Sequence, residues 1–357
     1  MADFSPHVSF AVSLLSRPLP FSAVAHEDKR VALLYFSLLS LDVCGALPAT
    51  LSASQRGSIL SWLHACVAPG GAAFCGSPDY SSAPSVAMTY AGVASLVLLR
   101  DAGAALDRGA ISRGLAAAQR PDGALDSTAL AGDGDVRFVF AGAAVAALLQ
   151  LPVAGTCGAA LDGEAAARFL TACQTYEGGF SLSPGGEAHG AATYCALAGA
   201  AALARAAAGD ARVAAMLGRL DTRAAARWLC LRKDALGAPT GRAGKDADAC
   251  YAFWLAGAYD ALRALDGGVS EEAVPPLLAE GGLAWVRGCA GARGAGFARE
   301  HGEMPDPFHT AYALAGLALA QTPGLRAVDA VLGVTRDSMD AWVPVLTKTG
   351  SVAAPNP

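Results

Sequence analysis

Two kinds of apolar segment alternate along the chain. A segment of the first kind holds a large aliphatic residue and, eight positions later, a glycine. The aliphatic residue recurs every 52 to 59 positions, and the five pairs are Leu63/Gly71, Leu115/Gly123, Leu170/Gly178, Leu229/Gly237 and Val286/Gly294. Such self-similarity at a nearly fixed period is the signature of a repeat protein. We expect an amphipathic helix at each copy and a break at the glycine, because glycine tolerates a positive φ.

The second kind of segment is almost free of charge. Its six copies are 31–43, 87–99, 136–148, 191–203, 248–262 and 308–320. Each has an aromatic residue near its start, at Tyr35, Tyr90, Phe140, Tyr194, Tyr251 and Tyr312. A helix that is apolar on all sides must be buried. The second kind therefore predicts six inner helices, and the first kind predicts an outer layer around them.

The two layers predict an all-α fold. We expect an α/α toroid, a closed barrel of six inner and about six outer helices built from helical-hairpin repeats of about 55 residues. An open solenoid has the same period, but it leaves charge-free inner helices exposed at both ends. We expect a single domain over 1–340 and a C-terminal tail over 341–357 whose last residues are mobile.

Composition narrows the possible partners and the compartment. The net charge is −5 and basic tracts are absent, so nothing favours nucleic acid. The nine cysteines are scattered without a CxxC motif, which is typical of a reducing compartment. The start of the chain lacks the pattern of a leader peptide. The dense apolar run 86–99 is shorter than the roughly 18 residues of a membrane-spanning helix. We expect a cytoplasmic protein with no integral membrane segment.

Ionisable residues gather near the starts of the inner segments. Arg137, Asp248 and His309 each lie three residues before an inner aromatic, and His189 is close to the same level. Equivalent positions of a repeat lie at one height of a barrel. These residues and Cys250 should therefore cluster at one end of a central cavity, above a well lined by the aromatic residues.

Asp, Cys and His form a common zinc ligand set, and three protein ligands leave a fourth position open. Residues i and i+2 of a helix point about 200° apart. Asp248 should therefore lie at the N-cap or just before it, with Cys250 in the first turn. The alternative is that Asp248 only caps the helix, Cys250 fills the core and His309 is a core histidine. Residue types alone leave both interpretations open.

Two basic residues, Arg242 and Lys245, precede Asp248 in GRAGKDADACY. Several cations above an apolar well suit an amphiphile with an anionic head. Alternatively, both side chains only solvate a loop.

Long motifs in these regions resemble one known family. They are MTYAG (88–92), DVRFVF (135–140), YEGGFSL (176–182), EAHGAATYCAL (187–197), GRAGKDADACYAFW (241–254) and GFAREHGEMPDPFHTAYALAGL (296–317). From about residue 7 to about 322 the chain resembles the β subunit of protein prenyltransferases, most closely geranylgeranyltransferase type I. The residues beside the third presumed ligand, PDPFHT, resemble the Rab-type subunit more closely. Phe308 in that motif stands where the type I enzyme often has an aliphatic residue.

The resemblance implies a catalytic zinc ion held by Asp248, Cys250 and His309, which binds the thiol of a C-terminal CaaX cysteine. That thiol would attack C1 of geranylgeranyl diphosphate, the co-substrate. The family's pattern assigns the diphosphate to His189, Arg242, Lys245 and Tyr251, and the walls of the lipid well to Arg137 and Trp254, with Tyr194 and Phe140 as neighbours.

Two further positions bear on the subtype. Farnesyl-using relatives carry tryptophan where this chain has Ala32, and alanine leaves room for a 20-carbon chain. Arg299 aligns with an aspartate that recruits magnesium in farnesyl and Rab-type enzymes, so a cation there implies that Mg²⁺ is not required.

The resemblance also implies an obligate heterodimer with a helical-repeat α subunit, and CaaX proteins such as small GTPases as substrates. The chain alone should be inactive. The nearest rivals are the β subunits of farnesyltransferase and of Rab geranylgeranyltransferase. A terpene cyclase is a more distant rival, but GDGDVR does not supply the DxDD acid of protonation-type cyclases. A non-catalytic lipid-binding barrel would hold no zinc and would tolerate loss of Cys250.

Overall fold

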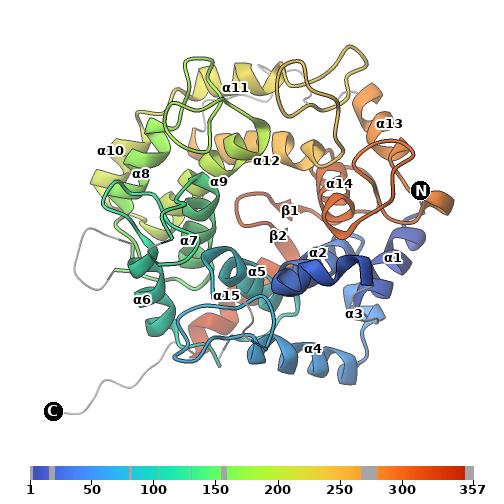
Figure 1. Cartoon of the computed structure of the whole chain (residues 1–357), viewed down its shortest axis with the longest axis horizontal. Coiled ribbons are helices and arrows are strands. Elements are labelled where there is room, and N and C mark those ends of the chain that lie inside the picture. Colours follow the sequence, from blue (N-terminus) through green and yellow to red (C-terminus); the bar gives the residue numbers. More distant parts are fainter. Residues whose placement is uncertain are drawn as a thin grey trace.

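Six buried helices form a ring around the centre of the molecule (Figure 1). They are α2 (Arg30–Val43), α5 (Val86–Leu98), α7 (Val136–Leu148), α9 (Gly190–Ala206), α12 (Tyr251–Leu265) and α14 (Pro307–Leu319). The computed structural model describes residues 3–15, 21–79, 83–103, 105–129, 131–153, 159–266 and 280–349. Each inner helix contacts the next, and α14 contacts α2, so the ring is closed.

A second layer surrounds the ring. It consists of α1 (Ser5–Leu15), α4 (Ala53–Ala65), α6 (Arg108–Ala118), α8 (Gly163–Ala172), α11 (Thr222–Cys230) and α13 (Glu280–Gly288). Shorter elements are η1 (Phe21–Lys29), α3 (Leu47–Thr50), α10 (Ala211–Leu217) and η3 (Ala292–Gly294). The predicted α/α toroid with six inner and about six outer helices is confirmed. Among the described residues, every helix is too short or too polar to cross a membrane.

Hydrogen bonds join successive repeats at the N-terminal ends of the inner helices. An amide at the start of an inner helix, or of the turn before it, donates to a carbonyl in the loop that precedes the next inner helix. These bonds run from Val31 to Gly76, from Val86 to Ser127, from Val136 to Leu182, from Gly190 to Gly241 and from Ala249 to Arg299, at 2.8–3.1 Å. The inner helices therefore begin at one level, as the repeat predicted.

The period-marking glycines have a different role from the one expected. All five have positive φ, but they lie beyond the helix ends: α4 ends at Ala65 and Gly71 comes six residues later. Gly123 shows what the position requires, since a Cβ there would lie 1.9 Å from the carbonyl oxygen of Ala165 on α8. Gly178 is crowded in the same way, with a Cβ 2.4 Å from the carbonyl oxygen of Ala224, whereas the positive φ is common to all five and explains the recurrence of glycine.

The C-terminal segment enters the ring, which the sequence did not predict. The hairpin of β1 (Val328–Asp329) and β2 (Val334–Thr335) lies at the centre of the ring in Figure 1. Three tyrosine hydroxyls donate to its turn: Tyr35 to the carbonyl of Gly333 (2.6 Å), Tyr90 to that of Leu332 (3.1 Å) and Tyr194 to that of Ala330 (2.7 Å). The inner aromatic residues therefore fix this hairpin from several helices at once.

α15 (Arg336–Thr349) follows the hairpin and packs against α5. Buried Trp342 donates from Nε1 to the carbonyl of Leu148 at 2.9 Å. The buried carboxylate of Asp42 accepts from Thr335 and Ser338 and pairs with Arg326. The boundary expected at residue 340 falls inside α15, and residues 350–357 of the expected tail lie outside the described residues.

Candidate active site

The starts of the inner helices carry side chains of two kinds. Ser85, Asp135, His189 and Asp306 each accept a backbone N–H at the N-cap of an inner helix. Cys250 occupies the same position in α12 and makes no such bond. An N-cap residue normally satisfies one of the free N–H groups of the first turn. Lys29, at the N-cap of α2, makes no such bond either, and at the start of α12 the carboxylate of Asp248 accepts the amide of Cys250 instead.

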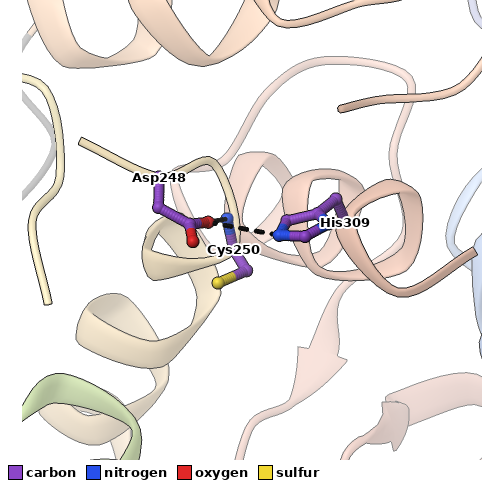
Figure 2. A group of neighbouring side chains, drawn as sticks. All are labelled: Asp248, Cys250 and His309. Atoms are coloured by element: carbon purple, nitrogen blue, oxygen red, sulfur yellow. Dashed lines mark hydrogen bonds and ion pairs between the residues drawn. The ribbon is translucent and has the colours of Figure 1, made fainter. Parts of the chain in front are cut away.

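Three donor side chains converge at this level (Figure 2). A carboxylate oxygen of Asp248, Sγ of Cys250 and a ring nitrogen of His309 all lie within 4.8 Å of one another. Nε2 of His309 is 3.5 Å from Oδ1 of Asp248, close to the ligand separation in a tetrahedral site with bonds of about 2.1 Å. These residues fit a metal ion with one O, one S and one N ligand. The predicted grouping of the three is therefore present in the structure.

The loop before α12 places the first two donors. Asp248 accepts the amide of Cys250 at 2.9 Å, and the carbonyl of Asp248 accepts the amide of Tyr251 at 3.1 Å. Asp248 lies two residues before the N-cap, as expected. Cys250 lies at the N-cap itself rather than in the first turn.

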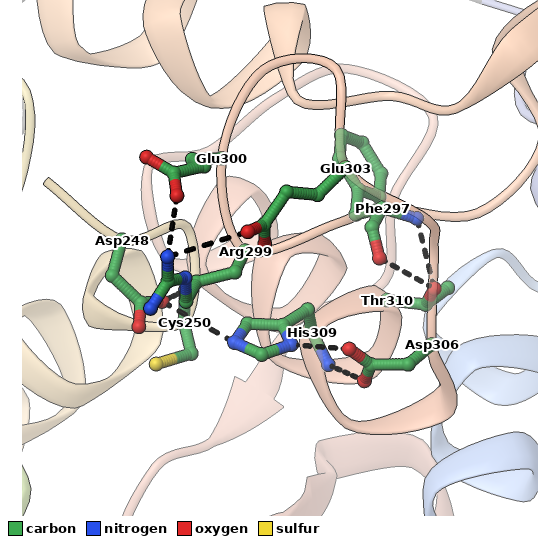
Figure 3. Close-up of polar contacts among 9 residues, drawn as sticks. All are labelled: Asp248, Cys250, Phe297, Arg299, Glu300, Glu303, Asp306, His309 and Thr310. Atoms are coloured by element: carbon green, nitrogen blue, oxygen red, sulfur yellow. Dashed lines mark hydrogen bonds and ion pairs between the residues drawn. The ribbon is translucent and has the colours of Figure 1, made fainter.

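Asp306 orients His309 and was missed by the sequence analysis. Its carboxylate accepts the amide of His309 at 2.9 Å and lies 2.5 Å from Nδ1 of the same residue (Figure 3). Nε2 is left to face Asp248. A metal-binding histidine usually donates its second nitrogen to such a carboxylate. The available signal was an aspartate three residues before a histidine at a helix start.

The titration of the three donors reflects this geometry. Burial opposes the charge of His309, but hydrogen bonds to Asp248 and Asp306 outweigh it and raise its pKa to about 9. Burial also works against the charge of Asp248, yet bonds from His309 and Cys250 lower the pKa of this carboxyl. Burial and the neighbouring Asp248 raise the pKa of the Cys250 thiol well above its usual range. These pKa shifts favour an imidazolium between the carboxylates of Asp248 and Asp306, beside a protonated thiol.

A cavity of about 660 Å³ opens at Tyr251, the residue that follows Cys250 in the chain. It is lined by residues 182–187 of the loop before α9, His189, Arg242 and Tyr251. Nδ1 of His189 accepts the amide of Ala192, so its proton lies on Nε2. Burial and the neighbouring cations Arg242 and Arg137 lower the pKa of His189, which keeps the ring neutral. His189 therefore adds an N–H donor to a lining that also includes the carboxylate of Glu187.

Tyr251 belongs to this cavity rather than to the aromatic level where it was expected. α12 begins at Tyr251, whereas the other inner helices begin four or five residues before their aromatic residue. A Cβ at Gly241 would lie 2.2 Å from Cζ of Tyr251, so the ring needs a glycine beside it. Burial raises the pKa of Tyr251 to about 12, so its hydroxyl remains a donor. Trp254 takes the vacant aromatic place, 5.0 Å from Tyr194 and 4.4 Å from Tyr312 between ring centroids.

Most of the predicted basic site residues are paired with carboxylates. Arg137 pairs with its helix cap Asp135 at 2.6 Å, and Arg242 pairs with Glu187 at 2.7 Å. Lys245 has no ion pair among the residues that the structure describes.

Arg299 lies close to Asp248, and Figure 3 shows it bound to Glu300 and Glu303. Its carbonyl also accepts the amide of Ala249. Ala32 is half-buried on α2, one turn before Phe36, whose ring packs edge-on against Phe308.

The closed ring and the donor cluster define the class of protein. The chain matches the family described as the prenyltransferase alpha-alpha toroid domain over residues 3–334, and it belongs to that family.

Known relatives are β subunits of protein prenyltransferases. The farnesyltransferase β subunit of Schizosaccharomyces pombe is 29% identical over 88% of this chain and 77% of its own length. The type-1 geranylgeranyl transferase β subunit of Arabidopsis thaliana is 28% identical over 70% and 62%. The chain thus spans less than two thirds of the second relative.

Solved structures agree on the fold. A chain of Candida albicans protein geranylgeranyltransferase-I complexed with GGPP superposes with a TM-score of 0.78 at 19% identity, covering 96% of this chain and 98% of that chain. A type II terpene cyclase from Scytonema gives a TM-score of 0.56 at 15% identity, covering 89% and 96%.

Proposed function

We propose that the chain is the β subunit of a zinc-dependent protein geranylgeranyltransferase type I. It would transfer a geranylgeranyl group from geranylgeranyl diphosphate to the cysteine thiol of proteins that end in CaaX. The observation that carries the proposal is the convergence of Asp248, Cys250 and His309, with a cavity at the residue that follows Cys250 in the chain.

The donor set favours zinc among the common metals, because zinc accepts mixed O, S and N ligands in four-coordinate sites. When bound, the ion would supply an open position and a charge that lowers the pKa of a substrate thiol. The chain's own residues prepare the site. Asp306 fixes the ring of His309, and the turn from Asp248 to Tyr251 holds the other two ligands at the start of α12.

The cavity supports binding of a diphosphate. The Nε2–H of His189, the hydroxyl of Tyr251 and the guanidinium of Arg242 all line it, and Lys245 lies on the same loop as Arg242. Fixed donors of this kind stabilise negative charge as it develops on a leaving group. Because Tyr251 and His189 are both neutral, they contribute as donors rather than as charges.

The balance of charge supports a partner. Arg137, Arg242 and Arg299 each face at least one carboxylate, which leaves Lys245 as the unneutralised cation of the predicted set among the described residues. A diphosphate carries two or more negative charges, so we expect a further cation from outside this chain. The relatives are named as subunits, and an α subunit is the partner that we propose.

Ala32 supports the 20-carbon lipid, because its methyl group leaves space beside the aromatic residues. A farnesyltransferase β subunit is the second candidate. The S. pombe farnesyltransferase β subunit matches 88% of this chain, and one turn after Ala32 the large ring of Phe36 packs edge-on against Phe308.

The test is transfer to a peptide ending in Leu, with geranylgeranyl and farnesyl diphosphate in competition. The chain is co-expressed with an α subunit, and magnesium is chelated without removing zinc. We expect preferential 20-carbon transfer, and Ala32→Trp should shift the preference towards farnesyl. Transfer of farnesyl alone, or transfer only with added magnesium, would rule out the type I assignment.

The metal is tested separately from the lipid. Purified chain should contain one zinc per molecule, and Cys250→Ala should reduce this content to near zero. Cys173→Ala removes a buried thiol at the end of α8 and should leave the zinc content unchanged. A non-catalytic lipid-binding barrel would give no zinc in either protein.

A further inference from the structure

Glu187 forms an ion pair inside a cavity that otherwise suits an anion. Its Oε2 lies 2.7 Å from Nη1 of Arg242, and both residues line the cavity with His189 and Tyr251. A carboxylate in such a place either competes with an anionic ligand for Arg242 or holds the Arg242 side chain in the orientation that binds the ligand. The geometry of the two loops decides between these roles.

The ion pair bridges two loops whose backbones are already joined. Glu187 lies on the loop before α9 and Arg242 on the loop before α12. The amide of Gly190 donates to the carbonyl of Gly241 at 2.9 Å, which sets the distance between these loops. The two side chains therefore meet across a fixed span rather than by movement of a loose segment.

Nothing else among the described residues holds the guanidinium of Arg242. Glu187 is its partner in both the hydrogen bonds and the ion pairs of that part of the chain. The carbonyl of Arg242 accepts the amide of Lys245 at 3.4 Å, which holds the backbone of Arg242 but leaves its guanidinium to Glu187. An arginine side chain loses conformational entropy when it is fixed by a bound ligand. The ion pair with Glu187 already restricts Arg242 in the free protein, so less entropy remains to be lost on binding.

The pair leaves donors for a ligand. A guanidinium carries five N–H donors in a planar fork, and Glu187 accepts from Nη1. The remaining N–H groups can face the cavity, where His189 and Tyr251 supply further donors.

We propose that Glu187 is a positioning residue that holds Arg242 in the orientation in which it binds the diphosphate group. This inference rests on the proposed function for the identity of the ligand, but the cavity and the ion pair carry it for any diphosphate. Glu187 acts through Arg242 and does not touch the reacting atoms.

The test is a double-mutant cycle on the full chain, with inorganic pyrophosphate and geranylgeranyl diphosphate as probes in calorimetry. We expect Arg242→Ala to weaken binding of both probes about twentyfold and Glu187→Ala about fivefold, since the pair is partly exposed. The double variant should bind no more weakly than Arg242→Ala alone. Glu187→Gln, which keeps a hydrogen-bond acceptor, should recover part of the loss.

Two measurements separate positioning from folding. Binding of geranylgeraniol, which has no diphosphate, should be the same in wild type and in Glu187→Ala. Glu164→Ala breaks a comparable exposed pair with Arg168 on α8 and should change neither probe's affinity. A general loss of structure would instead weaken binding of the neutral alcohol as well.

Tighter pyrophosphate binding by Glu187→Ala would show competition and overturn the proposal. A fivefold effect that persists without Arg242 would also overturn it. Wild-type binding of pyrophosphate, together with no prenyl transfer when the chain is co-expressed with an α subunit, would contradict the proposed function while the positioning role stands. A wild-type chain that binds neither probe would overturn both.

Discussion

His309 depends on one carboxylate for the direction of its ring. Asp306 accepts both the amide and Nδ1–H of His309, which leaves Nε2 for a metal. Asp306→Asn should weaken zinc binding about 10- to 100-fold without abolishing it. Competition with a chromogenic chelator measures this effect.

A matched control separates orientation from helix capping. Asp162 caps α8 through the amide of Ala165 at 3.0 Å, far from any predicted ligand. Asp162→Asn should cost a little stability and leave zinc affinity unchanged. Equal zinc affinity in Asp306→Asn and wild type would mean that Asp306 is only a cap.

Sequence reasoning at the residue scale succeeded where chemistry was distinctive. Asp248, Cys250 and His309 were predicted together and lie together. Asp306 was missed because an aspartate before a helix is ordinarily a cap, and its second role appears only when the ring of His309 is placed. The ion pair of Arg242 with Glu187 was equally invisible, since it depends on which loops meet. The pair of Arg137 with Asp135 is local to one helix start and was overlooked.

At the scale of elements, a buried histidine of α1 packs this helix against the segment that precedes α14. The ring of His7 stacks on Phe297, which precedes α14, with centroids 4.4 Å apart. Burial lowers the pKa of His7, so below about pH 6.5 the unfolded chain binds a proton that the folded chain does not. Stability is therefore present above this pH and is lost as the pH falls.

We expect the free energy of unfolding to fall between pH 7 and pH 5, by up to about 1.4 kcal/mol per pH unit for this group. His7→Phe should reduce the slope, while His26→Phe, at an exposed position, should not. Urea unfolding at several pH values measures it. His189 adds a slope of the same sign, which both variants retain. An unchanged slope in His7→Phe would contradict the assignment.

The central hairpin is a second test at this scale. Gly333 has φ +69°, and a Cβ there would lie 2.1 Å from the hydroxyl of Tyr90 and 2.8 Å from that of Tyr35. Gly333→Ala adds backbone strain and displaces both hydroxyls, so we expect a loss of about 3 kcal/mol. Gly324→Ala shares the positive φ but has its nearest neighbour, a ring carbon of Phe4, at 3.5 Å, and should cost about 1 kcal/mol. Equal losses in denaturant unfolding would show that the hydroxyl contacts contribute nothing.

The inner helices were predictable because a helix that is buried on all sides requires a segment almost free of charged residues, which is easily recognised in a sequence. The hairpin was not, since its turn is held through backbone carbonyls at Ala330, Leu332 and Gly333, which any residue provides. The shift of Tyr251 has a related cause. α12 starts late, after two predicted ligands that occupy its loop and cap, so counting back from aromatic residues misaligned this one repeat.

At the scale of the whole molecule, the described part of the candidate site leaves one predicted cation, Lys245, without an ion pair. We expect the purified chain to bind zinc but to transfer no lipid, and transfer to appear when an α subunit is added. Transfer assays with a radiolabelled lipid diphosphate measure this, with zinc content as the control for folding. Equal rates with and without the partner would contradict the charge argument.

Because the ring closes through the contact of α14 with α2, the number of helical hairpins fixes the rotation from each hairpin to the next. An open array can gain or lose a copy at its ends, but here a seventh hairpin would change the rotation between every pair of neighbours. The diameter of the interior is therefore set by the number of inner helices, which is six, and it can change only in whole steps. With the number of hairpins constant, the size of the molecule that the interior can hold depends on the bulk of the single side chains that line it.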